Sequence, residues 1–122
     1  MAMFDTVLLP ETKKLLLQLA PSSFPTGTYL GGGTAVALHL GHRRSADLDF
    51  FTPHEFNETQ LIAKLSSLPE FVQDGTAQWT VWGKISQTKF SMFYYKYPLL
   101  EETISFEGLR LASLADIAAM KI

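Results

Sequence analysis

Cysteine is absent from this sequence of 122 residues, which excludes disulfides, zinc–thiolate sites and thiol nucleophiles. No apolar run approaches the roughly 20 residues that a membrane-crossing helix needs. The N-terminus also lacks the basic start, apolar centre and cleavage site of a signal peptide. A net charge of -2 excludes the overall basicity of a dedicated nucleic-acid-binding protein. We therefore expect a cytoplasmic protein with no membrane partner, in which a local patch holds any phosphate-rich ligand.

Apolar residues are plentiful: 47% of the chain is hydrophobic and 12% is aromatic. A chain of this length and composition buries a real core and suits one domain, which we expect to span residues 1–122. No internal repeat, low-complexity tract or linker divides it. A helix that begins near Leu114 has no C-cap before Ile122, so we expect a domain truncated at its C-terminus, with the helical part that would follow missing.

Hydrophobic spacing and turn residues predict alternating helices and strands. The expected helices run from Pro10 to the residue before Pro21, from Thr34 to Leu40 with Gly41 as C-cap, from Glu55 to Leu68, and onward from Leu114 behind a capping box of Ser113 and Asp116. The expected strands are Thr28–Leu30, the run around Leu48–Phe51, Gln78–Trp82, Ser86–Tyr97 and Thr103–Phe106, with a turn at Gly83 and Lys84. This order predicts an α+β fold with a mixed sheet and helices around it.

Gly31, Gly32 and Gly33 stand between an expected strand and an expected helix. Unpaired N–H groups and the helix dipole favour an anion at such a place, and residues without a Cβ let a phosphate come close. A tight turn that binds no ligand explains the triplet equally well. The glycines alone leave both interpretations open.

Asp47 and Asp49 favour the functional interpretation. Residues two apart on a strand point to the same side and lie roughly 6.6 Å apart, so both carboxylates can meet one cation while Leu48 and Phe50 point into the core. Mg²⁺ suits this pair because one or two carboxylates, waters and substrate phosphates satisfy it. A solvated pair at a strand edge is the alternative.

Arg43, Arg44 and Ser45 precede the two aspartates. Guanidinium groups match phosphate geometry and suit a triphosphate, whereas charge balance for the aspartates is an equally good explanation of either arginine. His39 and His42 have the spacing of metal ligands, but surface and turn positions explain them better. An Asp-x-Asp hydrolase of the haloacid-dehalogenase kind is disfavoured, because Phe50 and Phe51 follow Asp49.

These residues carry a family resemblance. The run YLGGGTAVALHLGHRRSADLDFF at residues 29–51 resembles the first motif of the AbiEii/AbiGii-type nucleotidyltransferase toxins, within the DNA polymerase β-like superfamily. The run SLADIAAMKI at residues 113–122 resembles the family's Asp-Ile-x-Ala-x-Lys helix, and residues 89–100 resemble a strand between these blocks. The resemblance therefore extends from about Thr28 to the end of the chain.

The resemblance implies a minimal nucleotidyltransferase fold that transfers a nucleoside monophosphate from an NTP to an acceptor hydroxyl on RNA, such as a tRNA end, or on a protein. It implies a toxin of a toxin–antitoxin or abortive-infection system with a cognate antitoxin. Asp47 and Asp49 would bind Mg²⁺ or Mn²⁺ as catalytic acids. The phosphate-binding residues would be Gly31, Gly32, Gly33, Thr34, Arg43, Arg44, Ser45 and Lys121.

Two departures from the family pattern bear on activity. Many superfamily enzymes carry a third acid on a neighbouring strand, yet residues 89–98 contain none and Ser91 stands where an acid is expected. The third acid could instead be Asp74, Glu101 or Glu102, but their spacing in the sequence favours none of them. The family's later Asp-containing helical motif is also missing, so we expect weak or no transferase activity from this chain. Two alternatives to an active transferase remain. One is an inactive nucleotide-binding module, and the other is a structural protein that docks an antitoxin through residues 90–97.

Overall fold

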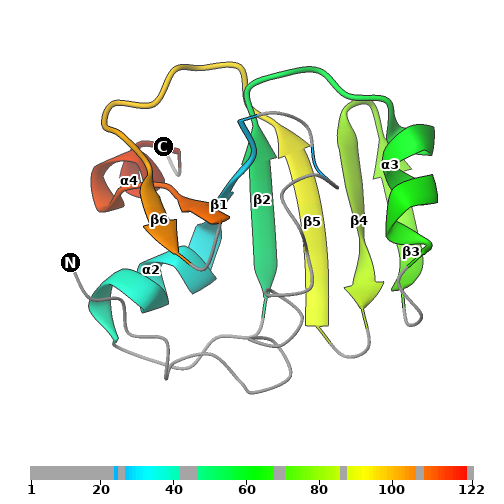
Figure 1. The fold of residues 1–122 in the computed structure, drawn as a ribbon, viewed down its shortest axis with the longest axis horizontal. Helices are drawn as coiled ribbons and strands as arrows, with labels where there is room; N and C mark the ends of the chain where they lie inside the picture. Colours follow the sequence, from blue (N-terminus) through cyan, green and yellow to red (C-terminus); the bar gives the residue numbers. More distant parts are fainter. Residues whose placement is uncertain are drawn as a thin grey trace.

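The structure, a computed structural model, describes residues 24, 27–41, 47–67, 71–85, 88–106 and 109–120. These residues form three helices and one seven-stranded sheet (Figure 1). In chain order the elements are β1 (Tyr29–Gly31), α2 (Gly32–Leu40), β2 (Leu48–Thr52), α3 (Glu58–Leu65), β3 (Phe71–Ala77), β4 (Thr80–Ile85), β5 (Thr88–Tyr94), β6 (Ile104–Phe106), β7 (Leu109–Leu111) and α4 (Leu114–Met120). No helix among them is long and apolar enough to cross a membrane.

The sheet is mixed, with the strand order β3-β4-β5-β2-β1-β7-β6. Strand β2 lies at its centre, parallel to β5 and antiparallel to β1. Strand β1 is parallel to β7, and the remaining neighbours are antiparallel. Helix α3 lies beside β3 and β4 at one end, and α2 and α4 lie at the other (Figure 1). The expected α+β fold with a mixed sheet flanked by helices is confirmed.

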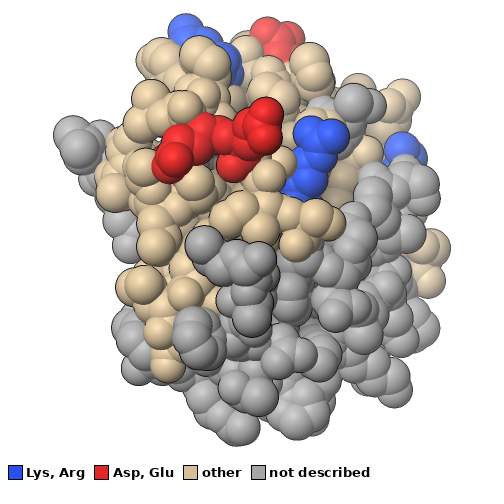
Figure 2. Space-filling model, turned by 60° about the vertical axis from the view of Figure 1, so that its left-hand side comes forward, with Lys and Arg blue, Asp and Glu red and all other residues tan. Residues whose placement is uncertain are grey.

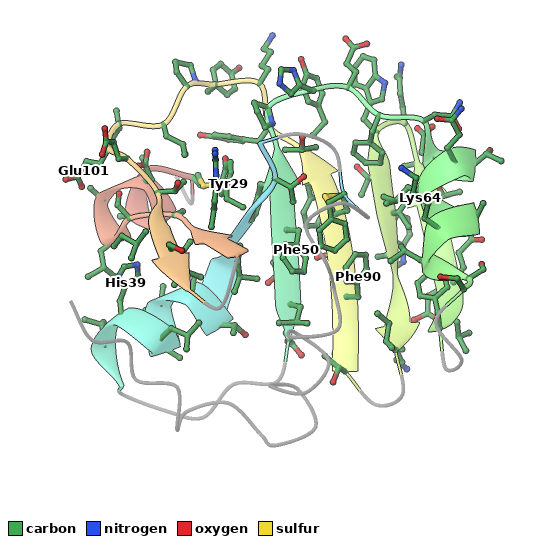
Figure 3. All side chains as sticks on the ribbon, in the orientation of Figure 1. Tyr29, His39, Phe50, Lys64, Phe90 and Glu101 are labelled. Carbon is green, nitrogen blue, oxygen red and sulfur yellow. The ribbon has the colours of Figure 1, made fainter. Side chains whose placement is uncertain are left out.

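The two faces of the sheet differ in chemistry because side chains alternate along each strand. Val81, Met92, Phe50 and Leu30 stand in register on four neighbouring strands and are all buried. Leu61 and Leu65 of α3 join the same core. Phe50 and Phe90, labelled in Figure 3, pack with ring centroids 5.7 Å apart. This face anchors β2 and β5, so residues on the other face are held in fixed positions.

Local sequence explains how the first site elements begin and end. Gly41 ends α2 in the left-handed conformation, with φ 64°, and its N–H donates to the Ala37 carbonyl, as the glycine predicted. Helix α2 begins at Gly32, two residues before the expected start at Thr34, so Gly32 and Gly33 belong to its first turn. Strand β2 ends just before Pro53, as predicted.

Helix α3 is shorter than the predicted range from Glu55 to Leu68. It begins after Asn57, whose side chain accepts a 2.9 Å hydrogen bond from the Gln60 N–H. Asparagine is among the strongest N-cap residues, and this cap overrode the apolar spacing that suggested an earlier start. The helix ends at Leu65, with Ser66 as its C-cap.

The predicted turn at Gly83 and Lys84 is wrong, because both residues lie inside β4. A Cβ at Gly83 would stand 2.3 Å from the Val72 carbonyl oxygen, next to a register irregularity between Gln73 and Gly75. Glycine in a strand often marks such a close backbone approach at a bulge. The prediction failed because glycine is typical both of turns and of strand positions where two backbones approach closely.

Two strands were missed by the sequence patterns. Strand β3 is a polar edge strand with mostly exposed side chains, so it lacks the apolar alternation that identifies a strand. Strand β7 spans only three residues. Strand β5 ends at Tyr94 rather than Tyr97, and it lies inside the sheet between β4 and β2. The predicted helix from Pro10 lies outside the described residues.

Candidate functional site

One row of residues crosses three strands on the face opposite the apolar core. Gly31 of β1 pairs with Asp49 of β2, and Asp49 pairs with Ser91 of β5. Residues paired across neighbouring strands share a face. The glycine turn and the second aspartate are therefore neighbours in space, as the sequence predicted.

Asp49 is half-buried between two partners of different kinds. The Ser91 hydroxyl donates a 2.6 Å hydrogen bond to Asp49 Oδ1. On the other side, a Cβ at Gly32 would stand 2.4 Å from Asp49 Oδ2. The carboxylate therefore lies directly against the first turn of α2, and only glycine leaves room for it there.

The glycine turn presents its backbone without a side-chain cap. Gly31 is the N-cap of α2, no side chain caps the helix, and its first turn contains no acidic residue. The backbone of Gly32 is left-handed, with φ 64°, a conformation that glycine adopts without steric cost. Uncapped N–H groups at the positive end of a helix dipole favour an anion, which fits the predicted phosphate role.

Asp47 lies one residue before β2, with an exposed side chain. Its backbone carbonyl accepts a hydrogen bond from the hydroxyl of Thr34, which is buried in the first turn of α2. Thr34 thereby ties the helix start to the residues that enter β2. In this structure the hydroxyl positions Asp47, and its predicted contact with phosphate stays a prediction.

Four predicted site residues fall outside the described part of the chain. They are Arg43, Arg44, Ser45 and Lys121. Their predicted contacts with a triphosphate stay predictions. His42 also lies outside, whereas His39 is half-buried and its Nε2 lies 2.9 Å from the Ala112 carbonyl, to which it donates. His39 therefore links α2 to the segment before α4 rather than standing free on the helix surface.

The position next to Asp49 on the neighbouring strand is a serine, as the sequence suggested. Asp74, one of the substitutes for a third acid, lies exposed on β3, with β4 and β5 between it and β2. Glu101 and Glu102 are exposed in the segment before β6. Glu101, labelled in Figure 3, lies at the end of the molecule that carries α4, where Figure 2 shows a group of acidic side chains. None of the three stands beside Asp49 in the sheet register.

Asp116 is a second carboxylate, and it is buried and hydrogen-bonded to the surrounding protein. It is 3% exposed and accepts hydrogen bonds from the N–H groups of Leu100 at 2.5 Å and Glu101 at 3.0 Å. The Ser113 hydroxyl donates to it at 2.8 Å and accepts from its N–H at 3.1 Å, the predicted capping arrangement. Burial raises the pKa of Asp116, but these hydrogen bonds together hold it below its ordinary value.

Tyr29 of β1, labelled in Figure 3, lies two residues before Gly31 on the same strand and therefore on the same face of the sheet as the site. Its hydroxyl is buried and has no hydrogen-bond partner among the described residues. Burial raises the pKa of Tyr29, and the charges of Tyr95 and Asp116 raise it further. The phenol therefore stays protonated and neutral.

Comparison with known proteins identifies the family. A family model described as the nucleotidyl transferase AbiEii toxin of a type IV toxin–antitoxin system matches residues 14–101. The chain belongs to this family. The uncharacterized protein aq_aa25 of Aquifex aeolicus (strain VF5) is 36% identical over 118 residues, covering 91% of this chain and 56% of that protein. The chain thus spans about half the length of this relative.

Solved structures share the AbiEii fold. The crystal structure of JHP933 from Helicobacter pylori matches with a TM-score of 0.62 and 23% identity, over 91% of this chain and 54% of that one. A second H. pylori structure matches equally well, over 91% of this chain and 56% of its own. Both likenesses concern the fold, and they agree with the expected minimal nucleotidyltransferase fold.

The residues around Asp49 are chemically compatible with a divalent cation of the kind that nucleotide phosphates bring with them. The described residues contain no group of three or more His, Cys, Asp or Glu side chains that would hold a metal on their own. Mg²⁺ in nucleotide sites needs only one or two carboxylates, because phosphates and waters complete its octahedron. The Asp49 carboxylate beside Gly32 and the exposed side chain of Asp47 would supply one or two such carboxylates.

Proposed function

We propose that this AbiEii-family chain transfers a nucleoside monophosphate from an NTP to a hydroxyl on RNA, such as a tRNA end, or on a protein, as a cytoplasmic toxin restrained by an antitoxin. The observation that carries the proposal is the contact of Asp49 with both Gly32 and Ser91. It brings a half-buried carboxylate to a helix N-terminus that no side chain caps. Negative charge and an anion-binding backbone are what a metal–triphosphate ligand requires.

In this proposal, Asp47 and Asp49 would hold Mg²⁺ or Mn²⁺, which supplies charge neutralisation on the transferring phosphoryl group. Gly31, Gly32, Gly33 and Thr34 bind the triphosphate, and Arg43, Arg44, Ser45 and Lys121 add cationic or hydroxyl contacts. The acceptor oxygen forms a bond to the α-phosphorus while the bond to the bridging oxygen breaks and pyrophosphate leaves. Such transfers depend on positioning and charge stabilisation more than on covalent help from the protein.

The proton of the attacking hydroxyl must leave during this reaction. A serine hydroxyl is a weak base, and that of Ser91 donates a hydrogen bond to Asp49. We therefore assign the final acceptance of the proton to water or an aspartate. A serine at this position makes general-base catalysis weaker than a third carboxylate would.

The test is incubation of the full-length protein, including any helical part beyond residue 122, with labelled NTPs, Mg²⁺ and separate RNA and protein acceptors, because weak or no transfer is expected from residues 1–122 alone. The expected result is label transfer that disappears in Asp49→Ala and on chelation of the metal, while Lys64→Ala on α3 transfers normally. Equal labelling by wild type and Asp49→Ala would contradict the proposal.

A second candidate is a nucleotide-binding module without turnover, and the serine opposite Asp49 favours it. Calorimetry with a non-hydrolysable NTP and Mg²⁺ separates the two, because the module binds the nucleotide although no acceptor is labelled. Ser91→Asp is the sharper variant. If only the third acid is missing, this substitution creates transfer activity in a protein that already binds NTP.

A further inference from the structure

We propose that the open face of β4 and β5 binds the end of a single-stranded polynucleotide, with Trp82 stacking on a base and Lys84 and Lys89 contacting backbone phosphates. This inference rests on the proposed function, since it assigns the surface that presents the acceptor. The surface, which we call the β4–β5 face, consists of Trp82, Lys84 and Lys89.

The β4–β5 face continues the row that contains Asp49. Trp82 of β4 pairs with Ser91 of β5, and Ser91 pairs with Asp49 of β2. Neighbouring strands lie about 4.8 Å apart, so the backbone of Trp82 is roughly 10 Å from that of Asp49. A strand whose terminal hydroxyl reaches Asp49 would therefore place a base before the terminal one on Trp82.

Trp82 is built into the sheet as a flat, open aromatic surface. It is 40% exposed, although large aromatic side chains usually bury most of their area. Its ring lies over Gly75 of β3, where a Cβ would stand 2.2 Å from Cζ2 and 2.4 Å from Cε2. A glycine inside a strand weakens the strand. Here the glycine leaves room for the Trp82 indole, which packs on Gly75 and remains partly exposed.

Lys84 and Lys89 are directly opposite each other in the antiparallel pair, and both are exposed. Like charges in this position destabilise a sheet. Among the described residues, no carboxylate forms an ion pair with either lysine. Two unpaired cations beside an exposed indole are a pattern for single-stranded nucleic acid, which combines stacking bases with phosphates.

The position of this face relative to Asp49 matches the geometry of phosphoryl transfer. The attacking and leaving oxygens lie roughly in line across the phosphorus. The proposed triphosphate site is on the β1 side of Asp49, so the leaving pyrophosphate lies on that side. Because β5 flanks β2 on the other side, the acceptor must approach over β5 and β4.

The charge of the β4–β5 face differs from that of the surface near α4. The exposed acids Glu101 and Glu102 lie at the α4 end, where they repel a phosphate backbone. The two lysines lie at the end of the sheet beyond Asp49. Of these two groups, the lysines attract a phosphate backbone and the two acids repel it.

The direct test is binding of fluorescein-labelled oligoriboadenylate and oligodeoxyadenylate, measured by anisotropy without NTP. The expected result is salt-dependent binding that Trp82→Ala weakens roughly tenfold, in line with the loss of one stacked base. Replacing Lys84 and Lys89 by alanine should reduce the slope of the salt dependence by about one unit for each phosphate that is no longer neutralised. The RNA and DNA arms show which sugar the site accepts.

Matched controls separate the face from general surface effects. Leu100→Ala removes a side chain that is 70% exposed at the α4 end, and Lys64→Ala removes a lysine of α3; neither should change binding. Gly75→Ala keeps Trp82 but displaces its ring, so it should weaken binding as Trp82→Ala does. In a Trp79→Phe background, oligonucleotide should quench the fluorescence of Trp82, the remaining tryptophan.

The inference is overturned if wild type does not bind either oligonucleotide at low salt, or if the Trp82 and lysine variants bind like wild type. It is also overturned if transfer to a protein acceptor, unaffected by Trp82→Ala, is the only labelling seen. Failure of the proposed function looks different, because oligonucleotide binding would persist while NTP binding or label transfer is absent. If both hold, Trp82→Ala raises the KM for the polynucleotide acceptor and leaves the affinity for NTP unchanged.

Discussion

Asp49 and Asp116 are two shielded carboxylates on one small fold, and their surroundings give them opposite roles. Asp116 is nearly fully buried and accepts hydrogen bonds from two backbone N–H groups and a serine hydroxyl. Asp49 is half-buried, has one serine donor, and directs its other oxygen at the uncapped start of α2. A carboxylate whose oxygens already serve the protein stabilises the fold, whereas one with an oxygen left at an anion-binding turn can serve a ligand.

The largest effect is expected for Asp49→Asn. It keeps the shape of the side chain and an acceptor for Ser91 but removes the charge that would hold the metal, so label transfer should fall about hundredfold or more, equivalent to about 3 kcal/mol. Thermal unfolding should change little. A transfer rate within a few-fold of wild type would remove Asp49 from the site.

Asp116→Ala should lower the stability of the fold and leave label transfer nearly unchanged. It leaves the N–H groups of Leu100 and Glu101 without their acceptor, so the free energy of unfolding should fall by about 2–3 kcal/mol, measured by denaturant titration. Transfer per folded molecule should stay near wild type. Asp116→Asn, which retains one acceptor oxygen, should lose less stability; a selective loss of activity in either variant would contradict a purely structural role.

Gly32→Ala tests the contact between the Asp49 carboxylate and the start of α2. The left-handed backbone should cost about 1–2 kcal/mol, and the added Cβ would displace the Asp49 carboxylate. Gly41→Ala is the matched control, because Gly41 has the same φ of 64° and lies at the far end of α2. Both variants should lose similar stability, but only Gly32→Ala should lose nucleotide binding by calorimetry.

The smallest effect concerns pH. The pKa of Asp116 is lowered in the folded protein, so its stabilising contribution is present above the ordinary aspartate value of about 3.9 and is lost as the pH falls through the lowered value. Unfolding free energy measured below pH 4 should therefore decrease less steeply in Asp116→Asn than in wild type. The pKa of Glu58 is also lowered, chiefly by the Trp79 N–H, so Glu58→Gln in both proteins removes that parallel contribution. Identical slopes would show that Asp116 does not titrate in this way.

Elements with local signals were predictable from the sequence. Helix α2 lies between a glycine start and the Gly41 cap, and β2 ends at Pro53, so their identities depend on neighbouring residues. The capping of α4 by Ser113 and Asp116 is equally local. Where a signal had two meanings, prediction failed: Gly83 marks a close strand approach rather than a turn, and polar β3 has no apolar alternation.

The sequence by itself predicted that a glycine turn and Asp49 lie close together, because it places them in an expected strand–helix–strand run, and the antiparallel pairing of β1 with β2 sets Gly31 opposite Asp49. Tertiary structure alone decided what stands on the other side of Asp49. The parallel pairing of β2 with β5 sets Ser91, 42 residues away, against the carboxylate, and the pairing of β4 places Trp82 next in that row. Strand register is fixed by which side chains the distant strands bury together, and no local pattern encodes that choice.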